Sequence, residues 1–344
     1  MAVYFGMERP ANYDRAYEAD LLSRLAPKIP EQVFDAHFHI SRDEIPNVPD
    51  AEAFDTWKEY TNHFLGGNRI RGGLVMAHPK YYAEKETLDS HRLFACQLAQ
   101  EHEGFVSGLV IRPQDDPREM DDHIRRFPRI VALKPYLTYS GAENIYEADL
   151  LQYAPEWMWE LASQYRLAMV LHLSHFGDGL SDPRNGEQLR YLCKKYPQVK
   201  VNLAHCAMGH NPDKLQQGLR YLDGLDNLWT DVSGIGEALS IICMLKYMGP
   251  ERVMFASDGY RFAFHHHSRV FALGGHFLSF SDRHAVDPSP LGLPTAYQFR
   301  PITPFAENLS ATVAACQVCG LTEAQWQDVF YNNAAKQFYP LVRE

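Results

Sequence analysis

The sequence predicts a (β/α)8 barrel, in which eight parallel strands alternate with helices. Eight short apolar runs rich in β-branched residues lie between residues 33 and 257, and segments with helical spacing of apolar residues separate them. The runs begin about 31 residues apart on average, as expected for one strand, one helix and their loops. This alternation indicates parallel strands joined by helical crossovers.

A doubly wound open sheet is the alternative fold, because it shows the same alternation of strands and helices. That fold more often carries a glycine-rich turn directly after its first strand, and this chain has none. The first strand is followed instead by a polar segment, residues 41–70, that contains Pro46 and Pro49. Long segments of this kind in compact domains are often functional. The barrel is therefore the favoured fold.

The individual elements follow from local patterns of apolar residues. The predicted strands cover residues 33–40, 73–77, 105–111, 130–136, 167–174, 199–206, 228–232 and 252–257. In the first helix Tyr17, Leu21, Leu22 and Leu25 share one face, and Pro27 should end it. Helices are predicted over residues 14–26, 51–64 and 88–101, in a short segment after Pro117, and over residues 148–165, 186–196, 212–222, 237–248, 306–319, 323–330 and 333–338.

No internal repeat or low-complexity tract stands out, and we expect a single domain over residues 1–344. Residues 1–32 should form a helical lead-in and residues 33–260 the barrel. Residues 261–303, rich in His, Phe, Pro and Ser, should form an insertion over the barrel mouth after strand eight. Residues 304–344 should supply the C-terminal helices.

The composition limits the classes of function. A net charge of −10 argues against nucleic acid as a partner, since phosphate contacts need basic patches. No apolar run is long enough to span a membrane and no export signal is apparent, so we expect a cytoplasmic protein without membrane attachment. The six cysteines are scattered, which favours free thiols. The close pair Cys316 and Cys319 lies in an Ala-rich apolar stretch and is expected in a helix core.

Polar residues close several of the predicted strands, at the end of a barrel where active sites lie. His37 and His39 are two apart on strand one and should point to the same face, an arrangement that suits a divalent metal such as zinc. Each such residue alone could be an ordinary hydrogen-bonding group. Their recurrence at the ends of successive strands favours one shared site. The set comprises His37, His39, Lys134, His172, His205, Asp231, Ser233 and Asp258.

These residues occur in segments that resemble the amidohydrolase superfamily, and most of all its amidohydrolase-related (amidohydrolase 2) branch, which includes aminocarboxymuconate semialdehyde decarboxylase-like enzymes. The similar segments span most of the chain. They are Phe34-Asp35-Ala36-His37-Phe38-His39, Leu171-His172, Leu203-Ala204-His205, Phe255-Ala256-Ser257-Asp258 and Asn332-Asn333-Ala334-Ala335-Lys336.

The resemblance implies that His37, His39, His172 and Asp258 bind a divalent metal ion, most simply Zn²⁺. It implies that His205 lies beside the ion, as a ligand of a second metal or as an acid/base. Lys134 has two readings: a carboxylated lysine that bridges two ions, or a free cation that binds a substrate carboxylate. A homodimer is also expected from the resemblance.

The implied ligand set supports two reactions on a small substrate that carries a carboxylate. In the first, a metal-activated water hydrolyses a C–N or C–O bond, with Asp258 moving the proton and His205 stabilising the oxyanion. In the second, a non-oxidative decarboxylase (carboxy-lyase), Asp258 or His205 protonates carbon. A non-catalytic barrel that binds a metabolite is a minor third hypothesis. One metal site serves the first two reactions, so the fold does not choose between them.

The expected substrate-binding residues are Lys134, Tyr136, Arg261 and Arg269. The two arginines follow the last strand closely and could bind a substrate carboxylate from the insertion. The triplet His265 to His267 lies between them. A solvated loop or an additional metal site are the alternatives for this segment.

Overall fold

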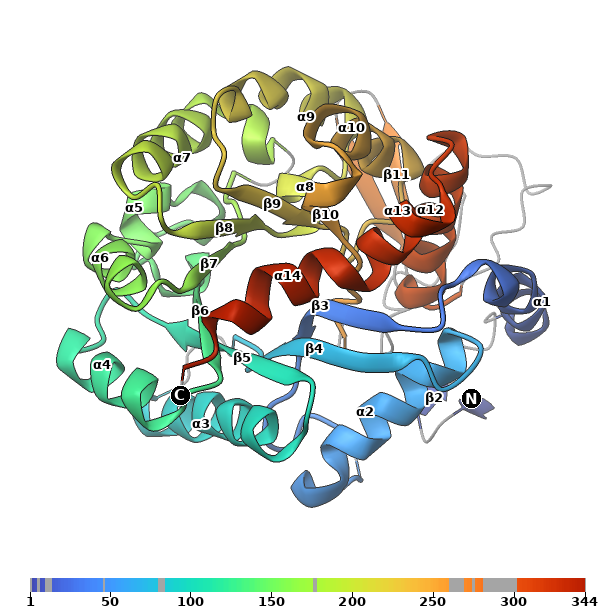
Figure 1. The fold of residues 1–344 in the computed structure, drawn as a ribbon, viewed down its shortest axis with the longest axis horizontal. Coiled ribbons are helices and arrows are strands. Elements are labelled where there is room, and N and C mark those ends of the chain that lie inside the picture. Colours follow the sequence, from blue (N-terminus) through green and yellow to red (C-terminus); the bar gives the residue numbers. More distant parts are fainter. Residues whose placement is uncertain are drawn as a thin grey trace.

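The predicted barrel is confirmed in the computed structural model, which describes residues 2–4, 7–9, 14–45, 47–79, 84–175, 178–259, 269–273, 276–280 and 302–343. Eight strands form one parallel sheet in the order β3 to β10, so that each strand pairs with the next along the chain. Helices surround this sheet (Figure 1). The barrel strands are β3 (Val33–His39), β4 (Ile70–Met76), β5 (Phe105–Ile111), β6 (Ile130–Pro135), β7 (Ala168–Leu171), β8 (Lys200–Leu203), β9 (Leu228–Asp231) and β10 (Val253–Met254).

Backbone hydrogen bonds between β3 and the segment after β10 close the barrel. The amide of Ala36 donates to the carbonyl of Phe255 at 3.0 Å, and the amide of Asp258 donates to the carbonyl of His37 at 2.9 Å. The amide of His39 donates to the carbonyl of Gly259. The closure therefore brings the histidine strand and Asp258 together through the main chain.

Most of the helices occur where the apolar spacing predicts them. They are α1 (Arg15–Leu25), α2 (Asp50–Phe64), α3 (Lys85–Glu101), α4 (Pro117–Arg126), α5 (Leu150–Tyr153), α6 (Glu156–Tyr165), α7 (Pro183–Lys195), α8 (His205–Met208), α9 (Pro212–Gly218), α10 (Ala238–Met248), α12 (Pro304–Val318), α13 (Glu323–Gln327) and α14 (Asn333–Phe338). The helix predicted over residues 148–165 is broken between α5 and α6, because Pro155 has no N–H to continue the hydrogen-bond ladder.

Three barrel strands are shorter than predicted. The predicted strands 167–174, 199–206 and 252–257 correspond to β7, β8 and β10, which end earlier. As a result His172 and Asp258 lie in loops just beyond their strands, and His205 begins the short segment α8 just beyond β8, all at the barrel mouth. Loop backbone can adopt conformations that a strand cannot, and His205 and Asp258 both use this freedom, with φ of 57° and 59°.

The C-terminal segment covers the N-terminal end of the barrel. In Figure 1, α14 crosses in front of the strands. Phe338 of this helix stacks on Phe34 of β3 with ring centroids 6.0 Å apart, and the Tyr339 ring meets Phe34 edge-on at 5.6 Å. Phe34, Leu74 and Phe338 belong to one buried cluster of apolar side chains. The inside of the barrel is thus a packed core that the chain's last helix completes.

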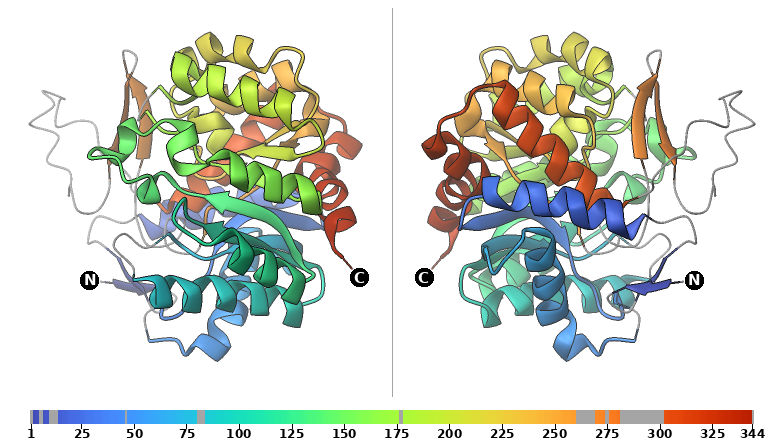
Figure 2. Two further views of the ribbon diagram at one scale, coloured as in Figure 1. Left: turned by 90° about the vertical axis from the view of Figure 1, so that its left-hand side faces the viewer. Right: turned by 90° about the vertical axis from the view of Figure 1, so that its right-hand side faces the viewer.

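Two antiparallel strand pairs lie outside the barrel and are absent from the predicted elements. They are β1 (Ala2–Tyr4) with β2 (Met7–Arg9), and β11 (Arg269–Leu273) with β12 (His276–Phe280). Figure 2 shows β11 and β12 projecting from the side of the molecule opposite the C-terminus, which is the side of the barrel mouth. The segment predicted as an insertion after strand eight therefore contains a two-stranded element where no secondary structure was predicted.

The cysteines agree with the expectation of free thiols. All six cysteines are free, and Cys316 is buried in α12 with Cys319 at its C-terminal cap. Among the described helices, none combines the length and the apolar character that crossing a membrane requires.

Truncation of Phe34 should destabilise the barrel strongly, because its fully buried ring packs against the strand core and the C-terminal helix. Phe34→Ala should lower the free energy of unfolding by about 3–5 kcal/mol in a denaturant titration. The control Leu239→Ala removes a side chain that is 56% exposed on α10 and should change it by less than about 0.5 kcal/mol. Equal effects of the two substitutions would contradict this description of the core.

Candidate active site

The structure gathers the predicted polar residues at the C-terminal ends of the strands. His37 and His39 lie on β3, Lys134 on β6 and Asp231 at the end of β9. His172, Ser233 and Asp258 lie in the loops that directly follow their strands, and His205 begins the short segment α8 after β8. His37 and Lys134 have no exposed surface, and His39 and His205 are 3% and 4% exposed.

Hydrogen bonds to protein oxygens determine which ring nitrogen of each histidine carries the proton. The Nδ1 atom of His39 lies 3.1 Å from the carbonyl of Ala77, and that of His172 lies 3.2 Å from the carbonyl of Leu173. A carbonyl oxygen can only accept, so each Nδ1 must donate. The unprotonated Nε2 atoms are then free to act as ligands, the form in which neutral imidazole binds metals.

His37 and His205 have the same tautomer for similar reasons. His37 Nδ1 lies 3.0 Å from a carboxylate oxygen of Asp231, and His205 Nδ1 lies 2.8 Å from the carbonyl of Ser233. Burial, and then the nearby Lys134 cation, lower the pKa of His37 to about 3 against the opposing effect of Asp231. His37 is therefore neutral at pH 7, with its lone pair on Nε2.

The lone pairs of His37, His39 and Asp258 converge on one another, and we call these three residues the lone-pair cluster. His37 Nε2 lies 3.2 Å from His39 Nε2, and the Oδ1 atom of Asp258 lies 3.6 Å and 3.5 Å from these two atoms. Ligand atoms of His37, His205 and Asp258 also lie within 4.8 Å of one another. Acceptors that face one another in a buried space repel unless a cation lies between them. The donor set of imidazole nitrogens and a carboxylate fits a divalent metal ion.

Asp231 forms hydrogen bonds that orient His37 and His205. Besides His37 Nδ1, its carboxylate accepts from the side-chain amide of Asn202 at 2.8 Å, the amide of His205 at 3.2 Å and the hydroxyl of Ser233 at 2.5 Å. Burial raises the pKa of this carboxyl, but His37 and the hydrogen bonds outweigh it and hold the pKa well below its usual range. Asp231 is thus an ionised acceptor that fixes ring orientation.

His205 is held in a strained backbone conformation. The residues from His205 to Met208 all have positive φ, between 50° and 60°, and form a left-handed turn directly after β8. This region is unfavourable for residues with a Cβ and persists only where surrounding contacts impose it. Strain of this kind is concentrated at functional sites, and here it places the ring of His205 5.2 Å from that of His37.

His172 and Tyr136 form one wall of the site. The His172 ring lies 5.0 Å from the ring of His205 and 5.4 Å from that of Tyr136. Burial, and then His205, lower the pKa of His172 well below its usual value. The tight group of ligand atoms contains His205 and not His172, and the ligand role of His172 stays a prediction.

Lys134 points into the same group of side chains. Its Nζ atom lies 3.5 Å from His37 Nε2 and 5.0 Å from the ring centroid of Tyr136. Burial lowers the pKa of Lys134 to about 8, while Asp231 and Asp258 act in the opposite direction. The ammonium group can donate to His37 Nε2, and the lone pair of His39 still faces that of Asp258.

Sequence reasoning missed three groups near the site. Asp35 accepts from the amide of Ser257 at 2.9 Å and from its hydroxyl at 2.5 Å, and so ties β3 to the loop that carries Asp258. The ring of His78 lies 5.6 Å from that of His39, and the ring of His210 lies 6.3 Å from that of His205. His78 follows β4 by two residues, so attention to the end of strand two could have found it.

Part of the predicted substrate-binding set cannot be placed. Arg261 and the triplet His265 to His267 lie outside the described residues. Arg269 is the first residue of β11, but the structure describes only its backbone. Lys134 and Tyr136 are therefore the predicted substrate-binding residues with a defined position.

A comparison with protein families tests the family resemblance that the residues at the strand ends suggest. The family model described as amidohydrolase matches residues 34–340, from the first barrel strand to the end of the last helix. The chain belongs to the amidohydrolase family. The predicted resemblance and the prediction of an enzyme of this family are thereby confirmed. A comparison with curated proteins finds no match.

Solved structures with the same fold include enzymes of two reaction types. A Pseudomonas putida protein assigned as a 2-pyrone-4,6-dicarboxylic acid hydrolase has a TM-score of 0.51 at 14% identity, over 92% of this chain and 100% of its own. The 5-carboxyvanillate decarboxylase of Sphingomonas paucimobilis has a TM-score of 0.52 at 14% identity, over 90% and 99%. A 2,6-dihydroxybenzoate decarboxylase from Rhizobium has a TM-score of 0.50 at 14% identity, over 89% and 98%. At these identities the likeness concerns the fold.

Removal of a predicted ligand should reduce the metal content of the purified protein. We expect about one or two equivalents of a divalent metal in the wild type, and at least a several-fold reduction in His37→Ala and Asp258→Asn, since each removes a donor from a small ligand set. Elemental analysis after dialysis measures this content. The control His63→Ala removes an exposed histidine of α2 and should retain the wild-type content. A metal content unaffected in all three variants would contradict the site assignment.

Proposed function

We propose that this chain is a metal-dependent hydrolase that cleaves a C–N or C–O bond of a small substrate carrying a carboxylate. The convergence of His37 Nε2, His39 Nε2 and Asp258 Oδ1 in a buried space carries this proposal. The family match supports it independently, because it covers all of the residues that contribute to the site.

The proposed ligands are His37, His39, His172 and Asp258, with His205 next to them. Four neutral or anionic donors of this kind suit Zn²⁺, and manganese or iron are alternatives with the same donor types. A divalent ion bound there would supply Lewis-acid chemistry, by polarising a substrate oxygen or lowering the pKa of a water molecule.

Asp258 is the proposed proton carrier. Its Oδ1 atom lies 3.6 Å from His37 Nε2 and 3.5 Å from His39 Nε2. Its side chain is 15% exposed, the largest exposure among the groups that meet at the lone-pair cluster. Asp258 can therefore accept a proton from an attacking water and pass it to the leaving nitrogen or oxygen.

The tautomer of His205 refines its predicted role. Because Nδ1 donates to the carbonyl of Ser233, the neutral ring presents a lone pair at Nε2 and cannot donate a hydrogen bond there. The oxyanion-stabilising role predicted from the sequence therefore requires a protonated ring. The neutral ring can act as a general base or as an additional ligand, and we propose this base or ligand role.

Lys134 is proposed to bind the substrate carboxylate or, if carboxylated, to bridge two ions. The first role is supported by its position, since its Nζ atom lies beside His37 and over the ring of Tyr136. Arg261 and Arg269 are proposed as further carboxylate-binding residues on the strength of the sequence alone.

Non-oxidative decarboxylation is the second candidate reaction. The buried cation of Lys134 could hold a substrate carboxylate, and two solved structures with the same fold are decarboxylases of aromatic acids. In this case Asp258 or His205 would deliver a proton to carbon as carbon dioxide leaves. A cytoplasmic location and a homodimer also remain predictions.

Product analysis should separate the two reactions. Incubation of the metal-loaded enzyme with carboxylate-bearing amides, lactones and aromatic acids should yield ring-opened or cleaved products without carbon dioxide. Asp258→Asn should lower kcat by at least about 100-fold because it removes the proton carrier, whereas His63→Ala should leave kcat unchanged. Release of carbon dioxide in proportion to substrate consumed would replace the hydrolase proposal with the decarboxylase.

Substitution of Lys134 should distinguish its two roles. If it binds a carboxylate as a cation, Lys134→Arg should retain measurable activity, Lys134→Met should raise KM at least about tenfold, and both should keep the wild-type metal content. If it bridges two ions as a carboxylated lysine, both variants should lose about one equivalent of metal, and the native mass of the wild type should include the added carboxyl group.

A further inference from the structure

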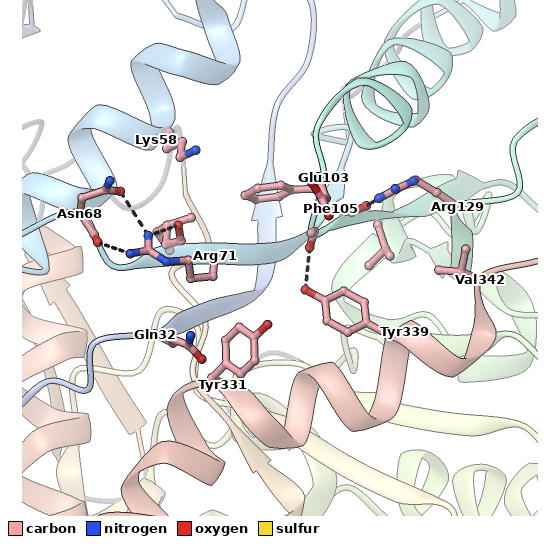
Figure 3. A pocket seen from close by; sticks show the side chains of 13 residues that line it. Gln32, Lys58, Asn68, Arg71, Glu103, Phe105, Arg129, Tyr331, Tyr339 and Val342 are labelled. Atoms are coloured by element: carbon pink, nitrogen blue, oxygen red, sulfur yellow. Dashed lines mark hydrogen bonds between the residues drawn. The ribbon is translucent and has the colours of Figure 1, made fainter.

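A pocket opens at the N-terminal end of the barrel, and we call it the basal pocket. It lies between the first residues of β4 and β5 and the C-terminal segment that carries Tyr331 and Tyr339, and it has a volume of about 630 Å³ (Figure 3). None of the residues of the lone-pair cluster lines it. The pocket is thus a separate feature from the candidate active site.

The length of the barrel separates the two sites. The lone-pair cluster includes His39 at the C-terminal end of β3, whereas Gln32, which precedes this strand, lines the basal pocket. The strand of seven residues between them spans roughly 20 Å at about 3.3 Å per residue. A ligand of ordinary metabolite size in one site therefore does not reach the other.

The lining of the basal pocket is cationic although the whole chain has a net charge of −10. Lys58 of α2, Arg71 of β4 and Arg129 before β6 contribute three positive charges, and of the described lining residues only Glu103 is acidic. In the part of the chain that the structure describes, none of the three cations forms an ion pair with a carboxylate. The local charge is therefore available to an anion from solution.

Main-chain oxygens hold the two guanidinium groups in place. Arg71 donates to the carbonyl of Asn68 at 2.9 Å, to its side-chain oxygen at 3.3 Å and to the carbonyl of Ile70 at 3.1 Å. Arg129 donates to the carbonyl of Phe105 at 2.9 Å. These contacts restrict the side chains without neutralising them, so less conformational entropy is lost when an anion binds.

Tyr331 and Tyr339 form the wall of the basal pocket opposite the strands. Figure 3 shows Tyr331 and Tyr339 rising from the C-terminal helices towards the strand that carries Arg71. The hydroxyl of Tyr339 donates to the carbonyl of Gly104 at 2.9 Å, which fixes its ring, and both rings pack on Phe34 of the barrel core. The pocket thus combines two oriented guanidinium groups and an amine with rigid aromatic surface.

We propose that the basal pocket binds a small organic polyanion, either phosphorylated or polycarboxylated. Guanidinium groups match the planar carboxylate and the phosphate oxygens equally well, so both classes share the recognised chemistry. Arg71 lies on β4 and Arg129 directly precedes β6, with β5 between these two strands, and neighbouring strands are about 4.8 Å apart. A ligand with two acidic groups joined by a short carbon skeleton fits this separation better than a single small anion.

Calorimetric titration of the full-length, metal-loaded protein tests the proposal. The probes are fructose 1,6-bisphosphate for the phosphorylated class, tricarballylate for the polycarboxylated class, and inorganic phosphate as the small anion. We expect one equivalent of at least one organic probe to bind, more tightly than inorganic phosphate, with an affinity that falls as salt is added.

Matched variants locate the binding. Arg71→Gln combined with Arg129→Gln should weaken binding at least about tenfold, because charge-assisted hydrogen bonds are lost. Lys58→Gln should weaken it several-fold and avoids the structural contacts that the arginines make. Arg118→Gln removes the same charge from an exposed position on α4 and should have no effect. His37→Ala should also bind the probe normally, since it alters only the metal site.

Two outcomes would overturn the proposal. One is the absence of binding of both organic probes by the wild-type protein at millimolar concentration. The other is binding that His37→Ala abolishes and the basal-pocket variants retain, which would place the probe in the metal site. Neither outcome bears on the hydrolase proposal, because metal content and product analysis test that separately.

Discussion

The assignment of the histidine N–H groups is the constraint on which the rest of the site depends. Each of the four rings gives its Nδ1 proton to an oxygen that the fold supplies, from Ala77, Leu173, Ser233 or the carboxylate of Asp231. The Nε2 atom on the opposite edge of each ring is left with a lone pair. Since these rings come from three different strands, the site forms only when the barrel closes and brings the strand ends to one mouth.

Closure of the barrel and the arrangement of the proposed metal ligands therefore depend on the same contacts. The same main-chain bonds that join the first strand to the segment after the last one also fix His37, His39 and Asp258 relative to each other. Asp35 adds a side-chain link to Ser257, and burial raises the pKa of its carboxyl to about 7 against the opposing hydrogen bonds. The left-handed backbone at His205 and Asp258 is tolerated because these contacts over-determine it.

The sequence predicted the barrel and the membership of the strand-end cluster because both follow from periodicity and strand order. It could not predict which ring nitrogen each histidine exposes, since the accepting carbonyls belong to residues distant in sequence. The left-handed turn after β8 has no sequence signal, because His205, Cys206, Ala207 and Met208 are ordinary residues in an unusual conformation. The break at Pro155 was predictable from its missing N–H, whereas the β11–β12 pair has no flanking pattern that sets it apart from a loop.

The packing of Phe338 on Phe34 has a consequence for how the molecule folds. The first barrel strand has its inner face covered by a helix about 300 residues later in the chain, a very long separation for a core contact. Until that helix arrives, the apolar interior at the base of the barrel stays open to water and to other chains. Partly folded forms that lack this helix therefore expose apolar surface that the folded molecule buries.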